Sequence, residues 1–249
     1  MSTLAPDDVG KFLVSARKAP FPYYELFYTM LFTGLRRSEV LALTWGSLDL
    51  NVCVLSVTQA LHKVTGGGYI SRVPKTRMSR RQVDIPPSLA LLLRDYRVKV
   101  EGQRLLLGTT LKDSDFVFAH LDGSPLEPST VTHMFGKVVR RAGIENLRLH
   151  DLRHSYASFM LTAGVNVKAI SQSMGHSSIS ITLDTYAYLL PGAGRTAAER
   201  LDRLLEPMVS GVEGVSKPLA KEGEIDSAPR GIRTHDPRFR RPVLLSAEL

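Results

Sequence analysis

The chain of 249 residues contains one cysteine, Cys53, and this scarcity excludes two kinds of structure. A single thiol can form neither a disulfide framework nor a cysteine-based zinc site, and it fits the reducing bacterial cytoplasm. No apolar run approaches the roughly 18 residues that a membrane-spanning helix requires, and no signal peptide is recognisable. The sequence therefore predicts a cytoplasmic protein with no membrane partner.

Two further absences bear on chemistry. No cluster of carboxylates suits a two-metal site, and no G-x-x-x-x-G-K-S/T loop is present to bind nucleotide phosphates. We therefore expect chemistry that needs no metal, no other cofactor and no ATP. Internal repeats are absent as well.

What the chain does carry is an excess of positive charge. The net charge is +8 at pH 7 and the isoelectric point is about 9.7. A basic balance of this size favours a polyanionic partner. Hydrophobic residues make up 43% of the chain, which is enough for one sizeable core or two small ones.

Apolar residues at helical spacing predict a mainly α fold. The first helix opens in the stretch LAPDDVGKFLVSARKA, where an aspartate in the first turn suits the helix dipole. Further helices are expected at about 23–32, 38–43, 87–100, 128–142, 150–163, 166–174, 177–188 and 194–206.

Between these helices the hydrophobic period changes to that of strands. Residues 52–58, 68–73 and 81–85 are expected to form one small three-stranded antiparallel sheet, with HKVTGG as the turn between the first two strands. From about Val209 the pattern dissolves into Gly-, Ser- and charge-rich sequence, which is typical of disorder. We therefore expect one folded domain over residues 1–207 and a disordered tail over 208–249.

One helix raises a question about charge. In HDLRH, residues 150–154, His150 and Arg153 stand three apart and therefore share a helix face. Both side chains can be cationic, and neither has an acidic partner on that face. An anion between them would remove the repulsion, so this helix predicts an anion-binding site.

Five stretches in a fixed order indicate which anion. They are TGLRRSE (33–39), PKTRMSRR (74–81), HDLRH (150–154), MGHSSI (174–179) and LDTYAYL (183–189), and each offers a group suited to a phosphate. This ordered set resembles the catalytic domain of the tyrosine recombinases, the integrases of phages and mobile elements. The resemblance covers residues 4–206, and its specificity comes from the order and spacing of the motifs, with a tyrosine ten residues after His176.

The resemblance implies a site-specific recombinase that cuts and rejoins DNA through a 3′-phosphotyrosyl intermediate, in the integration or excision of a phage or mobile element. Arg36 and Arg153 would clamp the phosphodiester oxygens, a role that suits the planar and permanently charged guanidinium. His150 and His176 would add hydrogen-bond donors, and one of them would accept the proton of the nucleophile. Neither arginine has an obvious carboxylate partner in the sequence.

Tyr186 is the expected nucleophile. Tyr188 is the alternative, but the two residues point about 200° apart on a helix, so only one can face the phosphate. The spacing in LDTYAY is similar to that of the longer-spaced integrases and favours Tyr186. The surrounding cations would activate the phenol, whose ordinary pKa is about 10.

The resemblance assigns protonation of the leaving 5′-oxygen to a hairpin lysine, and Lys75 fits that position. Lys63, Arg72 and Arg77 lie in the same hairpin region and are interpreted as ordinary phosphate contacts. Glu39 matches the acidic residue of the family and would orient its neighbours rather than react. Contacts to the DNA backbone are expected from Arg72, Arg77, Arg80 and Arg81.

The remaining candidates have structural or surface interpretations. Arg37 is expected to be a solvated neighbour of Arg36, and His154 is expected to be structural. Three further histidines are expected in surface or loop positions, namely His62, His120 and His133.

Two other functions stay open. Residues 163–186 resemble a helix-turn-helix with its turn near Gly175, as in a non-catalytic DNA-binding regulator. That interpretation leaves Arg36, Lys75 and the pairing of His150 with Arg153 unexplained. The other is an inactive, truncated integrase remnant, because family members usually carry a core-binding domain before the catalytic domain, and here the catalytic pattern starts almost at the first residue.

The resemblance also implies partners. Double-stranded DNA with attachment sites is the expected substrate, four protomers synapse two duplexes, and an excisionase or a host DNA-bending protein is an expected accessory factor. Residues 194–206 fit the segment that family members pass to a neighbouring protomer. Their apolar stripe consists of Ala198, Leu201, Leu204 and Leu205.

The end of the chain, GIRTHDPRFRRPVLLSAEL, has the character of a transfer-RNA gene translated on its antisense strand. GIRT and AEL can be encoded by the complements of T-arm and D-arm sequences, and Arg233 and Leu249 are 16 codons apart. Integrases commonly recombine into transfer-RNA genes, so the tail predicts such a gene as the attachment site and has no function of its own. The alternative is a basic, disordered tail that binds DNA.

Overall fold

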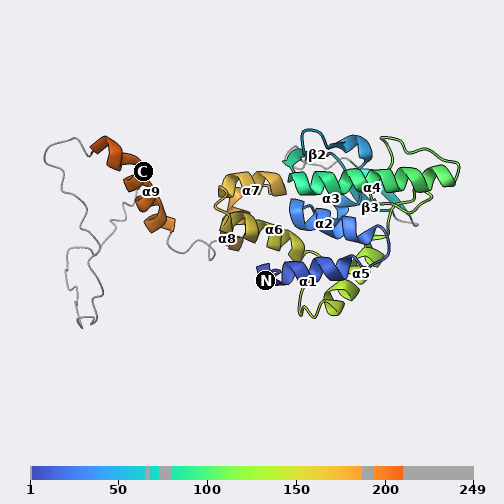
Figure 1. Cartoon of the computed structure of the whole chain (residues 1–249), viewed down its shortest axis with the longest axis horizontal. Helices are drawn as coiled ribbons and strands as arrows, with labels where there is room; N and C mark the ends of the chain where they lie inside the picture. The colour runs from blue at the N-terminus through green and yellow to red at the C-terminus, as the bar shows by residue number, and fades with distance from the viewer. Residues whose placement is uncertain (1, 65–67, 73–79, 187–192, 210–249) are drawn as a thin grey trace, which may run out of the picture. The chain divides into compact units, whose positions relative to one another are not determined.

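The computed structural model describes residues 2–64, 68–72, 80–186 and 193–209, and the predicted tail falls almost entirely outside these ranges (Figure 1). The chain divides into two compact units, residues 1–193 and 194–249. The first unit contains every described helix and strand up to α8, and α9 belongs to the second.

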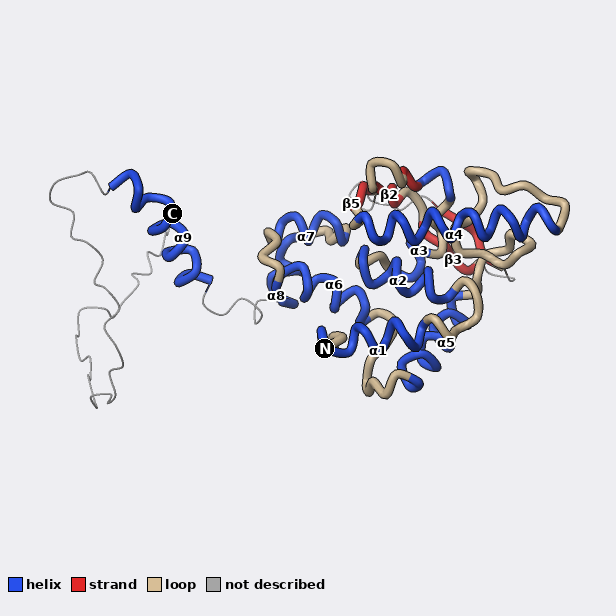
Figure 2. The backbone as a smooth tube through the Cα atoms, in the orientation of Figure 1, coloured by secondary structure: helices blue, strands red, loops and turns tan. Residues whose placement is uncertain are grey.

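The first unit is mainly helical, as predicted (Figure 2). Three of its helices begin with a proline at the first helical position. A backbone N–H at this position makes no hydrogen bond within the helix, so proline, which lacks the N–H, costs nothing there. The helices are α1 (Pro6–Ala16), α2 (Tyr23–Thr33), α3 (Arg37–Val40), α4 (Pro87–Leu106), α5 (Pro128–Arg141), α6 (Asp151–Thr162), α7 (Val167–Met174) and α8 (Ile179–Tyr186), with a short 3₁₀ helix at Trp45–Ser47.

The described strands form two antiparallel sheets where one was predicted. Strands β1 (Leu48–Asp49), β2 (Val54–Val57) and β5 (Arg81–Asp84) form a three-stranded sheet in the order β1-β2-β5. Strands β3 (Ala60–Lys63) and β4 (Tyr69–Arg72) form a separate hairpin.

The predicted sheet was right in its number of strands and wrong in its membership. The strands predicted at 52–58 and 81–85 do lie in one antiparallel sheet, where Leu55 lies opposite Val83. The stretch 68–73 pairs instead with Ala60–Lys63, part of which had been assigned to the turn. The sequence ALHK has no β-branched or aromatic residue, so its strand character comes from pairing with β4 and not from its own propensity.

Helix α2 lies at the centre of the first unit. It contacts α1, α4, α5 and α6, with α4 along one side of the view in Figure 1 and α1 with α5 along the other. Three buried rings join α1, α2 and α5: Phe12, Phe27 and Phe135, with centroid separations of 5.4–6.4 Å. This continuous core fixes the start of α3, which carries the first predicted site residue.

A smaller apolar cluster fixes α7 against α6. It contains Tyr156 and Leu161 from α6, and Ile170 and Met174 from α7. Because α7 has only eight residues, its position depends on these contacts and on the polar contacts at its end.

Gly34 makes the turn between α2 and α3. It adopts a left-handed conformation with φ of 62°, and its N–H donates to Met30 O at 3.0 Å. A Cβ at this position would overlap the ring of Tyr156 on α6. Only glycine therefore allows both the turn and the close approach of α6.

In the second unit, α9 spans Ala193–Val209, which confirms the helix predicted at 194–206. Leu201, Leu204 and Leu205 are 55%, 63% and 40% exposed. Three and four residues apart, they form an apolar stripe on one face of the helix. Among the described residues, no helix is long and apolar enough to cross a membrane.

Replacement of Gly34 by alanine tests this turn. Gly34→Ala should lower the free energy of unfolding by about 2 kcal/mol or more, because it adds backbone strain to an overlap with Tyr156. Gly10→Ala in α1 is the matched control, since a Cβ there meets nothing within 4 Å, and it should stabilise the helix by about 0.5–1 kcal/mol. Urea unfolding of both variants measures the difference, and equal effects would contradict this account of Gly34.

Candidate active site

Arg36 is the N-cap residue of α3 and lies directly after the turn at Gly34–Leu35. Its backbone N–H donates to Glu39 Oε2 at 2.9 Å, and its Nη1 donates to Glu39 Oε1 at 2.8 Å. The Arg36 side chain is 38% exposed, whereas that of Glu39 is 4% exposed. The prediction that Arg36 lacks a carboxylate partner is wrong, because one helical turn brings Glu39 back to the N-cap.

Glu39 binds a second arginine from a distant strand. Arg81, at the start of β5, donates from Nη1 and Nη2 to the two oxygens of Glu39 at 3.1 and 3.0 Å. Burial of Glu39 opposes ionisation, but the hydrogen bonds and charges of Arg81 and Arg36 outweigh it and lower the pKa of Glu39. The role expected of Glu39, to orient its neighbours, agrees with this geometry.

Arg153, on α6, is only 3% exposed. Its Nη1 donates to Gly34 O and its Nη2 to Met174 O, both at 2.6 Å. The sequence indicated no acidic partner for Arg153, and the acceptors found here are backbone carbonyls. These two carbonyls come from segments far apart in the chain and together fix the plane of the guanidinium.

Three arginines meet at the carboxyl end of α7. Arg81 Nε donates to Ser173 O at 2.5 Å, Arg153 to Met174 O at 2.6 Å, and Arg36 Nη2 to Gly175 O at 3.1 Å. These are successive carbonyls at the negative end of a helix dipole, where cations are favoured. Counting only the residues that the structure describes, three arginine charges face the one carboxylate charge of Glu39, so this part of the cluster is net positive.

His176 follows this cluster directly. Gly175 ends α7 with φ of 65° and turns the chain, and His176 Nδ1 lies 2.8 Å from Oγ1 of the fully buried Thr182 on α8. Burial, and then the charges of Arg153, Arg36 and Arg81, lower the pKa of His176 to about 4. The imidazole is therefore neutral at pH 7. Sequence reasoning missed Thr182, although it lies one turn before Tyr186.

Two further histidines, His150 and His154, lie in contact at the start of α6. His150 is the N-cap residue, and the two rings lie edge to face with centroids 4.9 Å apart. Burial and the charge of Arg153 lower the pKa of His150, while burial and His150 lower that of His154. Both rings therefore resist protonation, which reduces the repulsion between His150 and Arg153 that the sequence suggested.

The structure describes the other predicted site residues only in part. Tyr186 is the last residue of α8, and its side chain is outside the described set, as is that of Arg72 at the end of β4. Arg80 is exposed just before β5. The remaining residues lie wholly outside the described ranges: Lys75, Arg77 and Tyr188.

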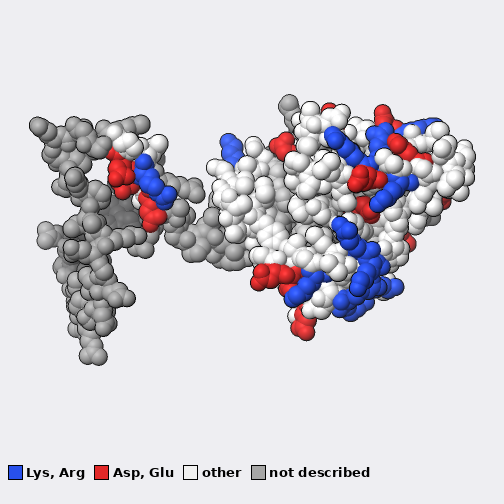
Figure 3. Space-filling model, viewed as in Figure 1, with Lys and Arg blue, Asp and Glu red and all other residues white. Residues whose placement is uncertain are grey.

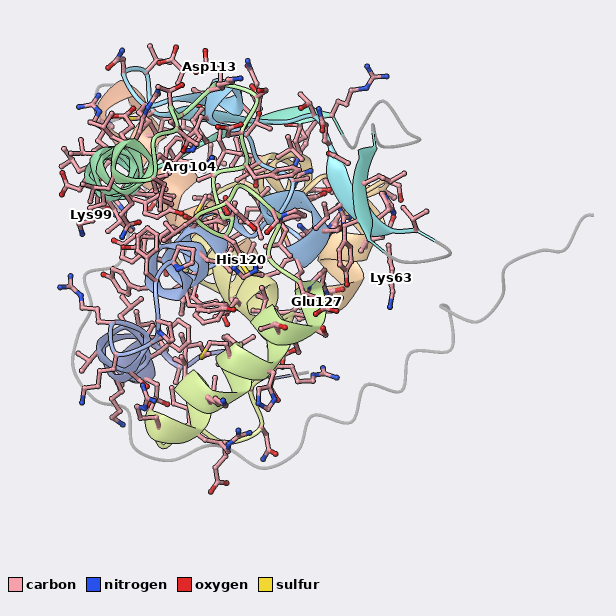
Figure 4. The ribbon with its side chains drawn as sticks, turned by 90° about the vertical axis from the view of Figure 1, so that its right-hand side faces the viewer. Lys63, Lys99, Arg104, Asp113, His120 and Glu127 are labelled. Carbon is pink, nitrogen blue, oxygen red and sulfur yellow. The ribbon has the colours of Figure 1, made fainter. Side chains whose placement is uncertain are left out.

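Other candidates have clear positions. Lys63 is exposed on β3 and its side chain points away from the protein (Figure 4). Arg37 Nη1 donates to Pro128 O at 3.2 Å and Thr132 Oγ1 at 2.6 Å, so it ties α3 to α5 instead of being merely solvated. The exposed positions predicted for three histidines are confirmed, namely His62, His120 and His133.

A cavity of 400 Å³ opens beside the arginine cluster, between β5 and α7, and His176 lines it together with Gln82, Asp84 and Gln172. Within the described part of the chain, no group of three or more His, Cys, Asp or Glu residues could hold a metal ion. Figure 3 shows one face of the molecule, where basic side chains gather over α5 and acidic and basic side chains alternate over α4.

Comparison with known proteins identifies the class of this fold and site. A sequence profile described as the phage integrase family matches residues 2–191, and the chain belongs to this family. It is 33% identical over 190 residues to a XerC-like tyrosine recombinase of Caldanaerobacter subterraneus subsp. tengcongensis, a match that covers 72% of this chain and 49% of the relative. It is 30% identical over 183 residues to the ICEBs1 integrase of Bacillus subtilis, covering 73% and 49%.

Solved structures agree with this assignment. The integrase of transposon Tn1549, in complex with circular intermediate DNA, matches with a TM-score of 0.68 and 28% identity, over 80% of this chain and 67% of that one. The catalytic domain of bacteriophage HP1 integrase matches with a TM-score of 0.53 over 94% of its length, at 22% identity, and shows the same fold. The predicted recombinase catalytic fold is therefore confirmed. The chain spans about half the length of the curated relatives.

The low pKa of His176 predicts a pH-dependent stability. Unfolding returns the group from a pKa of about 4 to its ordinary 6.5, so the unfolded chain binds a proton that the folded chain excludes. The free energy of unfolding should therefore be highest above pH 6.5 and fall as the pH drops toward 4. In urea titrations, His176→Gln should flatten this decline and the exposed-site control His133→Gln should not. An unchanged slope in His176→Gln would refute the prediction.

Proposed function

We propose that the chain is the catalytic part of a tyrosine-type site-specific recombinase that cuts and rejoins DNA during integration or excision of a mobile element. The observation that carries this proposal is the net-positive cluster of three arginines at the end of α7, next to a neutral His176. His176 is hydrogen-bonded to the helix that carries Tyr186. Family membership supports the same activity.

The arginines supply the electrostatic part of the reaction. Attack on a phosphodiester places negative charge on the equatorial oxygens, and fixed positive groups stabilise that charge. Arg153 suits this role because the carbonyls of Gly34 and Met174 hold the plane of its guanidinium. Arg36 suits it because its side chain is the most exposed of the three.

Position 186 lies in the part of α8 that is tied to His176. Thr182, the partner of His176, stands four residues before Tyr186 and therefore on the same helix face. If His176 Nδ1–H donates to Thr182, Nε2 carries the lone pair that can accept the phenolic proton. The tyrosine oxygen then bonds to phosphorus, and the 5′-oxygen leaves with a proton from Lys75. Because the bond energy is kept in the 3′-phosphotyrosyl link, rejoining needs no ATP.

The covalent link provides the direct test of Tyr186. A nicked suicide duplex, built from the DNA that flanks the gene, should trap a covalent adduct with the full chain in EDTA and without ATP. Tyr186→Phe should abolish the adduct on a denaturing gel, and Tyr188→Phe should retain it. Trapping by Tyr186→Phe but not by Tyr188→Phe would reverse the assignment. Loss in EDTA with recovery in magnesium would contradict metal-free chemistry.

The roles of Arg36 and Arg153 make a separate prediction. Replacing either by lysine removes the planar fork but keeps the charge, so adduct formation should fall by about 10²–10³-fold. DNA affinity should fall much less, because a charge near the phosphate remains. Binding assays and single-turnover trapping on the same duplex compare the two losses. Equal losses would make these residues simple phosphate contacts.

The partners belong to the same proposal. The substrate would be double-stranded DNA with attachment sites, for which the sequence of the tail suggests a transfer-RNA gene. We also infer action in the bacterial cytoplasm, at the nucleoid, with an excisionase or a host bending protein as accessory factor. Other protomers would complete a synaptic tetramer, and the exposed apolar stripe of α9 is the candidate contact.

The α9 stripe can be tested separately from catalysis. Leu201→Glu combined with Leu204→Glu should leave single-site DNA binding intact and abolish recombination between two sites. The matched control changes the polar face, with Glu199→Gln and Arg203→Gln, and should recombine normally. Gel-shift and two-site recombination assays make the comparison. If the leucine variant recombines normally, the stripe serves only local packing and makes no contact between protomers.

A non-catalytic regulator remains the second candidate, because α7 and α8 pack together and join at Gly175 as a helix-turn-helix would. A regulator would bind DNA and form no adduct with any suicide duplex. An inactive remnant would also form no adduct. The Tyr186 experiment therefore separates both from the recombinase.

A further inference from the structure

We propose that Arg81 is a positioning residue of the active site and not a DNA contact. Through Glu39 it holds the Arg36 guanidinium, and through Ser173 it holds the turn that presents His176. The inference rests on the proposed function and revises the phosphate contact expected from the sequence. It assigns this arginine, six residues after Lys75 in the chain, to the internal geometry of the site.

All three nitrogens of the Arg81 guanidinium donate hydrogen bonds. Nη1 and Nη2 donate to the two oxygens of Glu39, and Nε donates to Ser173 O. These acceptors lie 42 residues before Arg81 and 92 residues after it in the chain. A single planar group therefore fixes the distance between α3 and the end of α7, because its donors are rigidly spaced.

Arg81 also packs tightly against the turn that it holds. A Cβ placed on Gly175 would lie 2.7 Å from Arg81 Nη1 and 3.0 Å from Cζ. The absence of a side chain at Gly175 is thus what lets the guanidinium lie against the backbone directly before His176. No flexible side chain lies between the Arg81 guanidinium and the Gly175 backbone. A shift of the guanidinium would therefore move this backbone and, with it, the His176 ring.

Burial separates Arg81 from Arg36, whose side chain is 38% exposed. Arg81 and Arg153 are both deeply buried, with 7% of the Arg81 side chain and 3% of Arg153 exposed. Arg81 donates two hydrogen bonds to the Glu39 carboxylate, and Arg153 donates to the carbonyls of Gly34 and Met174. Each nitrogen of the buried Arg81 guanidinium donates a hydrogen bond inside the protein, which leaves this group poorly placed to bind a phosphate.

Glu39 accepts hydrogen bonds from both Arg81 and Arg36, which explains how Arg81 acts at a distance. With both oxygens of Glu39 engaged by Arg81, the Arg36 Nη1 bond at 2.8 Å fixes one side of the Arg36 plane and Gly175 O fixes the other. Without Arg81, the carboxylate would lose two of the four hydrogen bonds described above and would be free to rotate, and the Arg36 guanidinium would move with it. Arg81 would thereby hold the guanidinium of Arg36, the more exposed arginine, in a fixed orientation.

The test compares Arg81 with its exposed neighbour Arg80 in the full chain. Arg81→Gln and Arg80→Gln remove the same charge one residue apart, and Arg81→Lys keeps the charge but not the fork. Three quantities are measured: affinity for a duplex of mixed sequence at several salt concentrations, adduct formation on the suicide duplex, and the pH at which His176 titrates by NMR. The His176 signal, one of seven histidines, is assigned by its loss in His176→Gln.

Arg81→Gln and Arg81→Lys should each slow adduct formation at saturating DNA by about 100-fold, as expected for a misplaced catalytic group. Their DNA affinity and its salt dependence should stay within about twofold of the wild type. Arg80→Gln should instead weaken binding, lower the salt slope by about one, and reduce adduct formation only in proportion to binding. The His176 titration should move to higher pH in Arg81→Gln and stay in place in Arg80→Gln.

The proposal is overturned if Arg81→Gln behaves like Arg80→Gln, or if Arg81→Lys keeps wild-type adduct formation. If Arg81→Gln fails to fold, Glu39→Gln with Arg81→Gln removes both partners of the buried pair and is judged by the same criteria. If the wild-type chain traps no DNA, the proposed function fails, but the His176 titration still decides whether Arg81 positions this turn.

Discussion

The site depends on one buried carboxylate. Glu39 accepts hydrogen bonds from the Arg36 backbone, the Arg36 side chain and both Nη groups of Arg81. Two arginines of the same charge can lie this close only because the carboxylate between them offsets their repulsion. Its burial makes each of these hydrogen bonds stronger and makes the loss of any partner costly, so α3 and β5 are held together by charge as well as by apolar packing.

The carboxyl end of α7 completes the arrangement. Its last carbonyls have no partners within the helix, and three arginines from three different elements satisfy them. The same bonds stabilise a short helix and orient the groups that surround His176. Structural and chemical roles are therefore inseparable here, because the acceptors that position the arginines are the backbone of the segment that carries the histidine.

A recombinase needs a strongly positive site and a neutral base in the same small volume. The structure meets both needs through burial and charge. The arginine charges exceed the single carboxylate charge, and burial with those charges lowers the pKa of His176 to about 4. The hydrogen bond between His176 and Thr182 then ties this neutral ring to α8. The arginine cluster, His176 and α8 are thus connected through the hydrogen bonds at the end of α7 and the backbone that leads to His176.

The sequence by itself determined the helices, the mainly α class and the ordered set of Arg36, Glu39, His150, Arg153 and His176. Helical periodicity and motif spacing are local properties, so they can be read along the chain. Tertiary structure alone decided that Ala60–Lys63 is a strand, that carbonyls of Gly34 and Met174 hold Arg153, and that Arg81 pairs with Glu39. The arginine contacts join residues 21 to 119 positions apart in the chain. Every residue offers the same backbone carbonyl, so no sequence pattern marks the carbonyls that become acceptors.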